Sequence, residues 1–211
     1  ATASAFLADQ SNRDGSFEEA REYYLRAIST SPDTAIERKI QFRMSAAEML
    51  FKMEQYEKAA DEFNDLRENA SGEVLYTAWQ QAIIAEIRTG NLRRADSQID
   101  DYRNAAGLDD NSIPLLRFQY EKAKALASDK NFQQSIPMLQ AILGEDLPED
   151  FRVEVRYELG RQNVITNNYE TAIDILTGLT VDYPEHPMIA QVYITLGTVY
   201  YEQEQPANAI E

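Results

Sequence analysis

The sequence predicts an all-α solenoid of antiparallel helix pairs, with five full hairpins and a partial sixth. Three observations indicate this fold class. One set of small and large apolar positions recurs every 36 to 40 residues along the whole chain. Short polar turns separate the paired segments, and the eight glycines and seven prolines are too few for a turn-rich β protein. With 44% hydrophobic residues, the chain has enough apolar surface to bury a core.

The pattern is clearest between residues 153 and 186. In the second helix of this hairpin, Ala172, Leu176 and Leu179 share one face because they are spaced by four and three residues. An Asn-Asn pair at 167–168 forms the polar turn before this helix, and a proline ends it. Two amphipathic helices joined by a short turn form a helical hairpin.

The second helix of every hairpin has the same pattern of positions. A small marker residue stands in its first turn, and the markers are Ala20, Ala59, Ala95, Ser135, Ala172 and Ala209. Three positions earlier the residues are Phe17, Tyr56, Leu92, Phe132 and Tyr169, with Pro206 in the last unit. Four and seven positions later they are Tyr24 and Ala27, Phe63 and Leu66, Ile99 and Tyr102, Leu139 and Ile142, and Leu176 and Leu179. We expect these positions to form the core between the hairpins.

The first helix of each hairpin repeats more loosely. A small residue precedes the marker by twelve positions in most units, at Ala8, Ala47, Ala123, Gly160 and Gly197, with Ile83 as the exception. The turns inside the hairpins are Asp14-Gly15, Glu54-Gln55, Gly90-Asn91, Lys130-Asn131 and Asn167-Asn168. Such short connections predict antiparallel neighbours.

This pattern resembles the tetratricopeptide repeat family. The first unit fits the family's frame of about 34 residues at Leu7-Ala8, Gly15, Phe17, Ala20, Tyr24, Ala27 and Pro32. Trp79 stands where the family favours tryptophan, while Lys122 and Pro137 depart from the pattern. The resemblance covers essentially the whole chain and implies a right-handed superhelical solenoid. It implies one domain over residues 1–211, with repeats at 1–34, 40–73, 76–109, 116–149, 153–186 and a truncated 190–211.

Composition restricts the partner and the chemistry. The formal net charge of −16 argues against binding to nucleic acid or to anionic lipid, because both need a cationic surface. The acidity indicates a solvated surface, with a dedicated cation-binding face as the alternative. The absence of cysteine excludes disulfides and thiolate metal sites. No stretch reaches the roughly 20 apolar residues of a membrane-spanning helix, and we expect no direct membrane insertion.

The sequence predicts no catalytic site, no metal site and no cofactor, and hence no enzyme. His186, the only histidine, has no partner at the spacing of a zinc motif. Adjacent acidic pairs diverge on a helix and are poor acid–base pairs, although an incidental calcium contact at Asp109-Asp110 is an alternative. We expect Trp79 and the other repeated aromatic residues to fill the seam between helices, with ligand stacking as the alternative.

The first helices of successive hairpins would line a concave groove. We expect the partner to bind there at Gln80, Gln81, Arg117, Tyr120, Lys124, Tyr157 and Arg161. Arg117 and Lys124 are seven residues apart and therefore share one stripe, and Arg161 lies at a comparable height on the next first helix. These cations could receive a carboxylate or an acidic segment. The alternative is mutual pairing with Glu121, Glu154 and Glu158.

The sequence thus predicts a non-catalytic scaffold that binds a peptide or protein segment in this groove, with Tyr120 and Tyr157 as anchors. The alternative function is a self-associating assembly module of the bacterial cell envelope, because an uncapped last repeat would expose an apolar C-terminal edge. That edge comprises Tyr193, Leu196, Val199 and Tyr200. Residues 182–187 resemble cell-envelope members of the family, which favours a periplasmic or envelope location over the cytoplasm. Both ends fall inside helical patterns, so we expect a piece of a longer protein.

Overall fold

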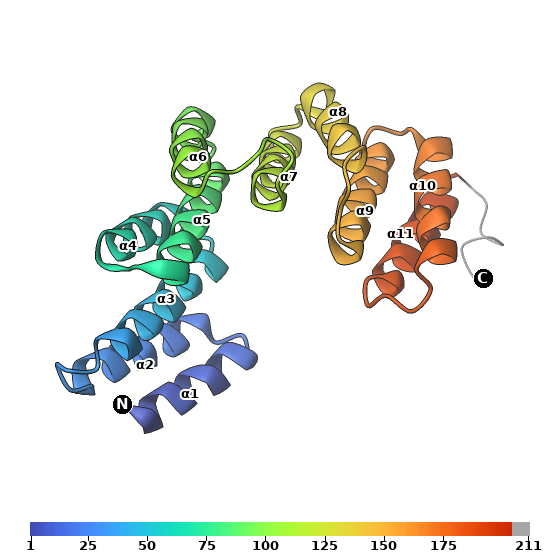
Figure 1. The fold of residues 1–211 in the computed structure, drawn as a ribbon. Helices are drawn as coiled ribbons and strands as arrows, with labels where there is room; N and C mark the ends of the chain where they lie inside the picture. Colours follow the sequence, from blue (N-terminus) through green and yellow to red (C-terminus); the bar gives the residue numbers. More distant parts are fainter. Residues whose placement is uncertain (204–211) are drawn as a thin grey trace. The chain divides into compact units, whose positions relative to one another are not determined.

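The structure, a computed structural model, describes residues 1–203, so the markers Pro206 and Ala209 lie outside the described part. The described residues form eleven α-helices and no strand, which confirms the predicted all-α class (Figure 1). The helices are α1 Thr2–Arg13, α2 Phe17–Thr30, α3 Ile36–Lys52, α4 Tyr56–Asn69, α5 Gly72–Arg88, α6 Leu92–Ala106, α7 Ile113–Ser128, α8 Phe132–Leu143, α9 Glu149–Ile165, α10 Tyr169–Asp182 and α11 Ile189–Glu202.

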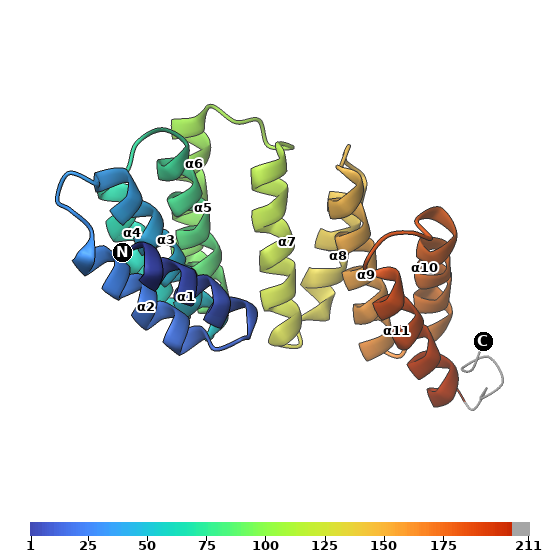
Figure 2. The ribbon, with the colours of Figure 1, turned by 90° about the horizontal axis from the view of Figure 1, so that it is seen from below.

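The chain divides into two compact units, residues 1–108 and residues 109–211. Unit 1 contains α1 to α6, and the described part of unit 2 contains α7 to α11. Within each unit, consecutive helices pair and the pairs stack on one another (Figure 2). The pairs match the predicted hairpins, and α11 is the first helix of the partial sixth. The single domain over residues 1–211 stays a prediction.

In the turn inside each hairpin, the residue five positions before the marker has a left-handed backbone conformation. These residues are Gly15, Glu54, Gly90, Lys130 and Asn167, with φ between 59° and 81°. In four of the five turns the next backbone N–H donates to the carbonyl five residues earlier, as in Asn131 to Leu126 at 2.8 Å. This bond satisfies carbonyls that the helix end would otherwise leave without partners. Glycine and asparagine tolerate this backbone, whereas Glu54 and Lys130 adopt it at a steric cost.

The repeated positions form the core, as the sequence predicts. Every described marker, from Ala20 to Ala172, has no exposed surface. Phe63 and Leu66 are fully buried in unit 1, and Leu176 and Leu179 are fully buried in unit 2. Ile99 is the exception, because it is only half-buried.

The aromatic residues at repeat positions pack inside the hairpins. The ring of Trp79 meets that of Tyr102 edge-on, with the ring centres 5.6 Å apart. The guanidinium carbon of Arg67, on α4, lies 4.7 Å from the centre of the Trp79 ring, which is a cation–π contact between α4 and α5. These contacts confirm that Trp79 fills the seam between helices.

Helices α9 and α10 approach closely where α9 has a glycine. A Cβ atom placed on Gly160 would lie 2.7 Å from Cδ2 and 2.8 Å from Cγ of Leu176. Leu176 is itself fully buried. The small residue at this repeat position therefore sets the helix separation, and a side chain would force the two helices apart.

Candidate functional site

The cations predicted for the groove already have carboxylate partners inside unit 2. Arg117 of α7 reaches Glu154 of α9 at 3.3 Å, and its guanidinium lies 4.3 Å from the centre of the Phe151 ring. The Nζ atom of Lys124 lies 3.2 Å from Glu121 on the same helix. The pairing that the sequence left as an alternative is therefore confirmed, and none of these cations presents an uncompensated charge.

Arg161 has the most complete pairing of the three. Its Nε donates to one oxygen of Glu158 at 3.0 Å, and its Nη2 donates to the other at 2.8 Å. Accepting these bonds, the Glu158 carboxylate raises the pKa of Arg161 above its usual value. The Arg161 side chain is 44% exposed, whereas that of Glu158 is 6% exposed. The carboxylate therefore lies inside the unit, and the cation lies at the surface above it.

A buried polar chain continues inward from this pair. Gln162 donates from Nε2 to Glu158 at 2.9 Å, and its carbonyl oxygen lies 2.7 Å from the hydroxyl of Ser135 on α8. That hydroxyl also lies 2.7 Å from the backbone carbonyl of Ala123 on α7. Ser135 and Gln162 have no exposed surface. Sequence reasoning treated Ser135 only as a small marker. The missed signal was a serine where the other hairpins have alanine.

The two predicted tyrosine anchors have different environments. Tyr120 is 8% exposed, and its ring packs edge-on against Phe151 with the centres 5.7 Å apart. It contributes mainly to the core of unit 2. Tyr157 is half-buried, and its hydroxyl lies 3.1 Å from the hydroxyl of Thr195 on α11. This hydrogen bond places the first helices α9 and α11 next to each other.

Helix α11, which Tyr157 contacts through Thr195, presents exposed apolar side chains. Ile194 is 70% exposed and Tyr201 is 73% exposed. They are seven residues apart and therefore lie on one stripe of the helix. The predicted C-terminal edge is smaller than expected, because Leu196 and Val199 are buried at 7% and 0% exposure. Of that edge, only Tyr193 is exposed, at 56%.

The remaining predicted groove residues belong to unit 1. Gln80 and Gln81 lie on α5 and are half-buried. The amide nitrogen of Gln80 donates to the hydroxyl of Tyr102 on α6. The predicted set is therefore divided between the two units. Five of its seven members lie in unit 2, on α7 and α9.

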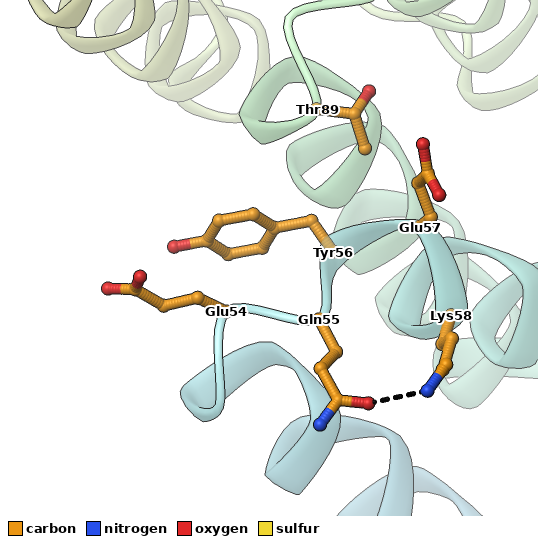
Figure 3. Close-up of a pocket in the computed structure, with 6 residues that line it drawn as sticks. All are labelled: Glu54, Gln55, Tyr56, Glu57, Lys58 and Thr89. Carbon is orange, nitrogen blue, oxygen red and sulfur yellow. Dashed lines mark hydrogen bonds between the residues drawn. The ribbon is translucent and has the colours of Figure 1, made fainter.

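Unit 1 also has a shallow pocket of about 280 Å³ at the α3–α4 turn (Figure 3). Its lining residues are Glu54, Gln55, Tyr56, Glu57, Lys58 and Thr89. The ring of Tyr56 and the side chain of Glu54 point to one side, whereas Glu57 lies toward Thr89. Lys58 donates to Gln55 at 2.9 Å. The pocket contains no paired nucleophile and base, and no residue of the predicted groove lines it.

Comparisons with known proteins agree with this architecture. A family model for the tetratricopeptide repeat matches residues 12–34. A tetratricopeptide repeat protein from Parabacteroides merdae is similar with a TM-score of 0.67 at 16% identity, over 98% of this chain and 73% of that one. BtubC from P. vanneervenii is similar with a TM-score of 0.61 at 15% identity, over 92% of this chain and 84% of that one. The Rap conjugation gene regulator of plasmid pLS20 is similar with a TM-score of 0.61 at 11% identity, over 98% of this chain and 72% of that one.

The chain has the tetratricopeptide-repeat fold. No curated protein matches the sequence. Within the helix pairs of unit 2, α7, α9 and α11 are the first helices. Arg117, Tyr120, Lys124, Tyr157 and Arg161 all lie on these first helices, as the resemblance implies.

Other features of the chain have structural explanations. His186 accepts the backbone N–H of Met188 at Nδ1, at 3.2 Å, and its Nε2 lies 3.3 Å from Asp150. These bonds fix the turn before α11 to the start of α9. Among residues 1–203, no group of three or more histidine or acidic side chains could hold a metal ion. Over the same residues, no helix is both long and apolar enough to cross a membrane.

Proposed function

We propose that the chain is a non-catalytic protein-interaction module, and that unit 2 binds a segment of its partner across the first helices α7, α9 and α11. The observation that most favours this proposal is the surface formed by Tyr157, Arg161, Ile194 and Tyr201. We call these four residues the α9–α11 surface. It combines two strongly exposed apolar side chains with a cation held in a defined orientation. Exposed aromatic and aliphatic anchors beside an arginine are typical of interaction hot spots.

The pairing of the cations defines the chemistry of the partner. Residues 109–211 contain seven basic and 17 acidic residues, so the unit repels an acidic segment at long range. The cations of the face are neutralised by Glu121, Glu154 and Glu158, so they do not reverse this repulsion locally. We therefore propose a partner segment with apolar side chains and an uncharged hydrogen-bond acceptor, in place of the acidic segment that the sequence suggested. Its affinity should vary little with ionic strength.

A similar structure supports a peptide-binding role by analogy. The Rap regulator of plasmid pLS20, which shares the fold at 11% identity, forms a complex with the Phr* peptide. Such a likeness concerns the fold, and the site on this chain must be argued from its own residues.

The proposal can be tested with a phage-displayed library of random peptides selected against the whole chain. Peptides that survive selection should lose at least tenfold in affinity for the Ile194→Ser variant. The matched control is Val181→Ser on α10, because Val181 is 72% exposed and Ile194 is 70% exposed. Equal losses in both variants, or no loss in either, would remove the α9–α11 surface from the proposal.

Self-association is a weaker second candidate, since only Tyr193 of the predicted edge is exposed. Sedimentation of the wild-type chain and of Tyr193→Ser decides it. A wild-type monomer across the concentration range excludes this candidate.

A further inference from the structure

The surface cation Arg161 is connected to the interior of unit 2 by an unbroken series of side-chain hydrogen bonds. The series runs from Arg161 to Glu158, then to Gln162, and ends at Ser135. Ser135 and Gln162 are fully buried, and Glu158 is 5% exposed. The series joins α9 to α8, and through the carbonyl of Ala123 it also joins α7.

Each member of the series limits the freedom of the next. The hydroxyl of Ser135 has one proton to donate, and the Gln162 oxygen is one of its two acceptors at 2.7 Å. Because the Glu158 carboxylate only accepts hydrogen bonds, the amide nitrogen of Gln162 faces Glu158 and its oxygen faces the Ser135 hydroxyl. Glu158 can then turn neither toward solvent nor away from Arg161 without losing a buried hydrogen bond. The guanidinium is planar and is held at two of its nitrogens, so its orientation is set.

We propose that Gln162 and Ser135 are positioning residues of the α9–α11 surface, and that they orient Arg161, through Glu158, toward an uncharged acceptor on the partner. This inference rests on the proposed function. Glu158 uses Nε and Nη2 of Arg161, whereas Nη1 has no partner among the described residues. A neutralised guanidinium with free N–H groups suits a carbonyl oxygen better than a carboxylate, because Glu158 already supplies the negative charge.

The alternative explanation is that the buried series only stabilises the contact between α8 and α9. If the role is structural, removing Gln162 changes the peptide affinity by the same factor whether or not Arg161 is present. If Gln162 positions Arg161, the loss of peptide affinity on removing Gln162 depends on whether Arg161 is present. A double-mutant cycle measures this dependence.

The experiment uses the whole chain and peptides obtained by the library selection described above. Gln162→Leu keeps the volume of the side chain and removes its donor to Glu158. We expect it to lower peptide affinity at least threefold in the wild-type background. In the Arg161→Ala background, we expect it to change affinity by less than a factor of two. The matched control is Asn163→Ala, because Asn163 is also buried on α9, at 5% exposure, but its side chain donates only to the carbonyl of Leu159.

A second measurement is independent of any partner. Hydrogen exchange at Nε–H of Arg161, followed by NMR, should be slow in the wild-type chain and at least tenfold faster in Gln162→Leu and Ser135→Ala. Asn163→Ala should leave it unchanged. Circular dichroism checks that each variant is folded, and Ser135→Ala tests the series if Gln162→Leu does not fold.

The outcomes separate the two proposals. If Arg161→Ala binds the selected peptides as the wild type does, the proposed surface is wrong and the positioning role falls with it. If Arg161→Ala weakens binding while Gln162→Leu and Ser135→Ala do not, only the positioning role is overturned. Equal effects of Gln162→Leu with and without Arg161, or unchanged exchange at Nε–H, overturn it as well.

Discussion

Replacing Gly160 by alanine tests whether the small residue on α9 sets the helix spacing. The new Cβ would lie 2.7 Å from Cδ2 of Leu176, well inside contact distance. Leu176 is fully buried, so overpacking should cost about 1–3 kcal/mol. Alanine gains about 1 kcal/mol over glycine in helix propensity. The net expectation is a loss of up to about 2 kcal/mol in the free energy of unfolding of unit 2, measured by urea titration.

Gly178 on α10 provides a matched control for this substitution. A Cβ there would lie 2.6 Å from Nη2 of Arg156, which is the end of a flexible side chain. That guanidinium can move away and lose its pair with Asp182, worth about 0–1 kcal/mol, and a long contact with the Tyr183 ring, whose centre is 6.0 Å away. Gly178→Ala should therefore be neutral or slightly stabilising, since helix propensity improves by about 1 kcal/mol.

The steric explanation also predicts non-additivity. Leu176→Ala removes the atoms that the new Cβ would meet, so Gly160→Ala should cost less in the Leu176→Ala background than in the wild type. The reasoning is refuted if Gly160→Ala is as stable as Gly178→Ala, or if its cost is the same in both backgrounds.

The remaining predictions concern core packing, a strained turn and a buried acid. Phe63→Ala should lower the free energy of unfolding by about 3–5 kcal/mol in a urea titration, because Phe63 is fully buried, and a cost below about 1 kcal/mol would contradict the assigned core. Lys130→Gly should raise the free energy of unfolding by up to about 1 kcal/mol, because Lys130 has a φ of 59°. Gly15→Ala should lower the free energy of unfolding, because Gly15 has a φ of 77°. Desolvation raises the pKa of Glu86 despite its pairing with Arg94 at 3.1 Å, so the folded state binds a proton more readily than the unfolded state. Its contribution to stability should therefore increase as pH falls through the window between the usual glutamate pKa and the raised one. Glu86→Gln should flatten the pH dependence of the thermal midpoint in that window, and an unchanged slope would contradict the assignment.

The sequence was sufficient to predict the core because hydrophobic spacing reports which face of a helix is buried. Phe63, Leu139 and Leu176 occupy equivalent positions and are all fully buried. Ile99 differs, since it has the same spacing but is only half-buried. Periodicity therefore predicts the buried face, but not how closely each neighbour covers it.

The candidate site was less predictable for an identifiable reason. Helical phase placed Arg117, Tyr120 and Arg161 correctly on first helices, but it could not tell whether a cation is free or paired. Pairing depends on rotamers and on neighbours such as Glu154, which is 37 residues from Arg117. The burial of Tyr120 could not be predicted for the same reason, because its contact with Phe151 joins two hairpins.

The two innermost members of the polar chain below Arg161, Ser135 and Gln162, occupy positions that most other hairpins fill with apolar residues, although Gln10 stands at the position of Gln162 in the first hairpin. Four of the five described markers are alanine, and the residues equivalent to Gln162 include Met49 and Ala85, both fully buried. A designed array that used the average residue at each position would keep the helix stacking and erase the arrangement around Arg161. This chain therefore differs from an averaged repeat at two interior residues, Ser135 and Gln162, which a comparison of surface residues between homologues would overlook.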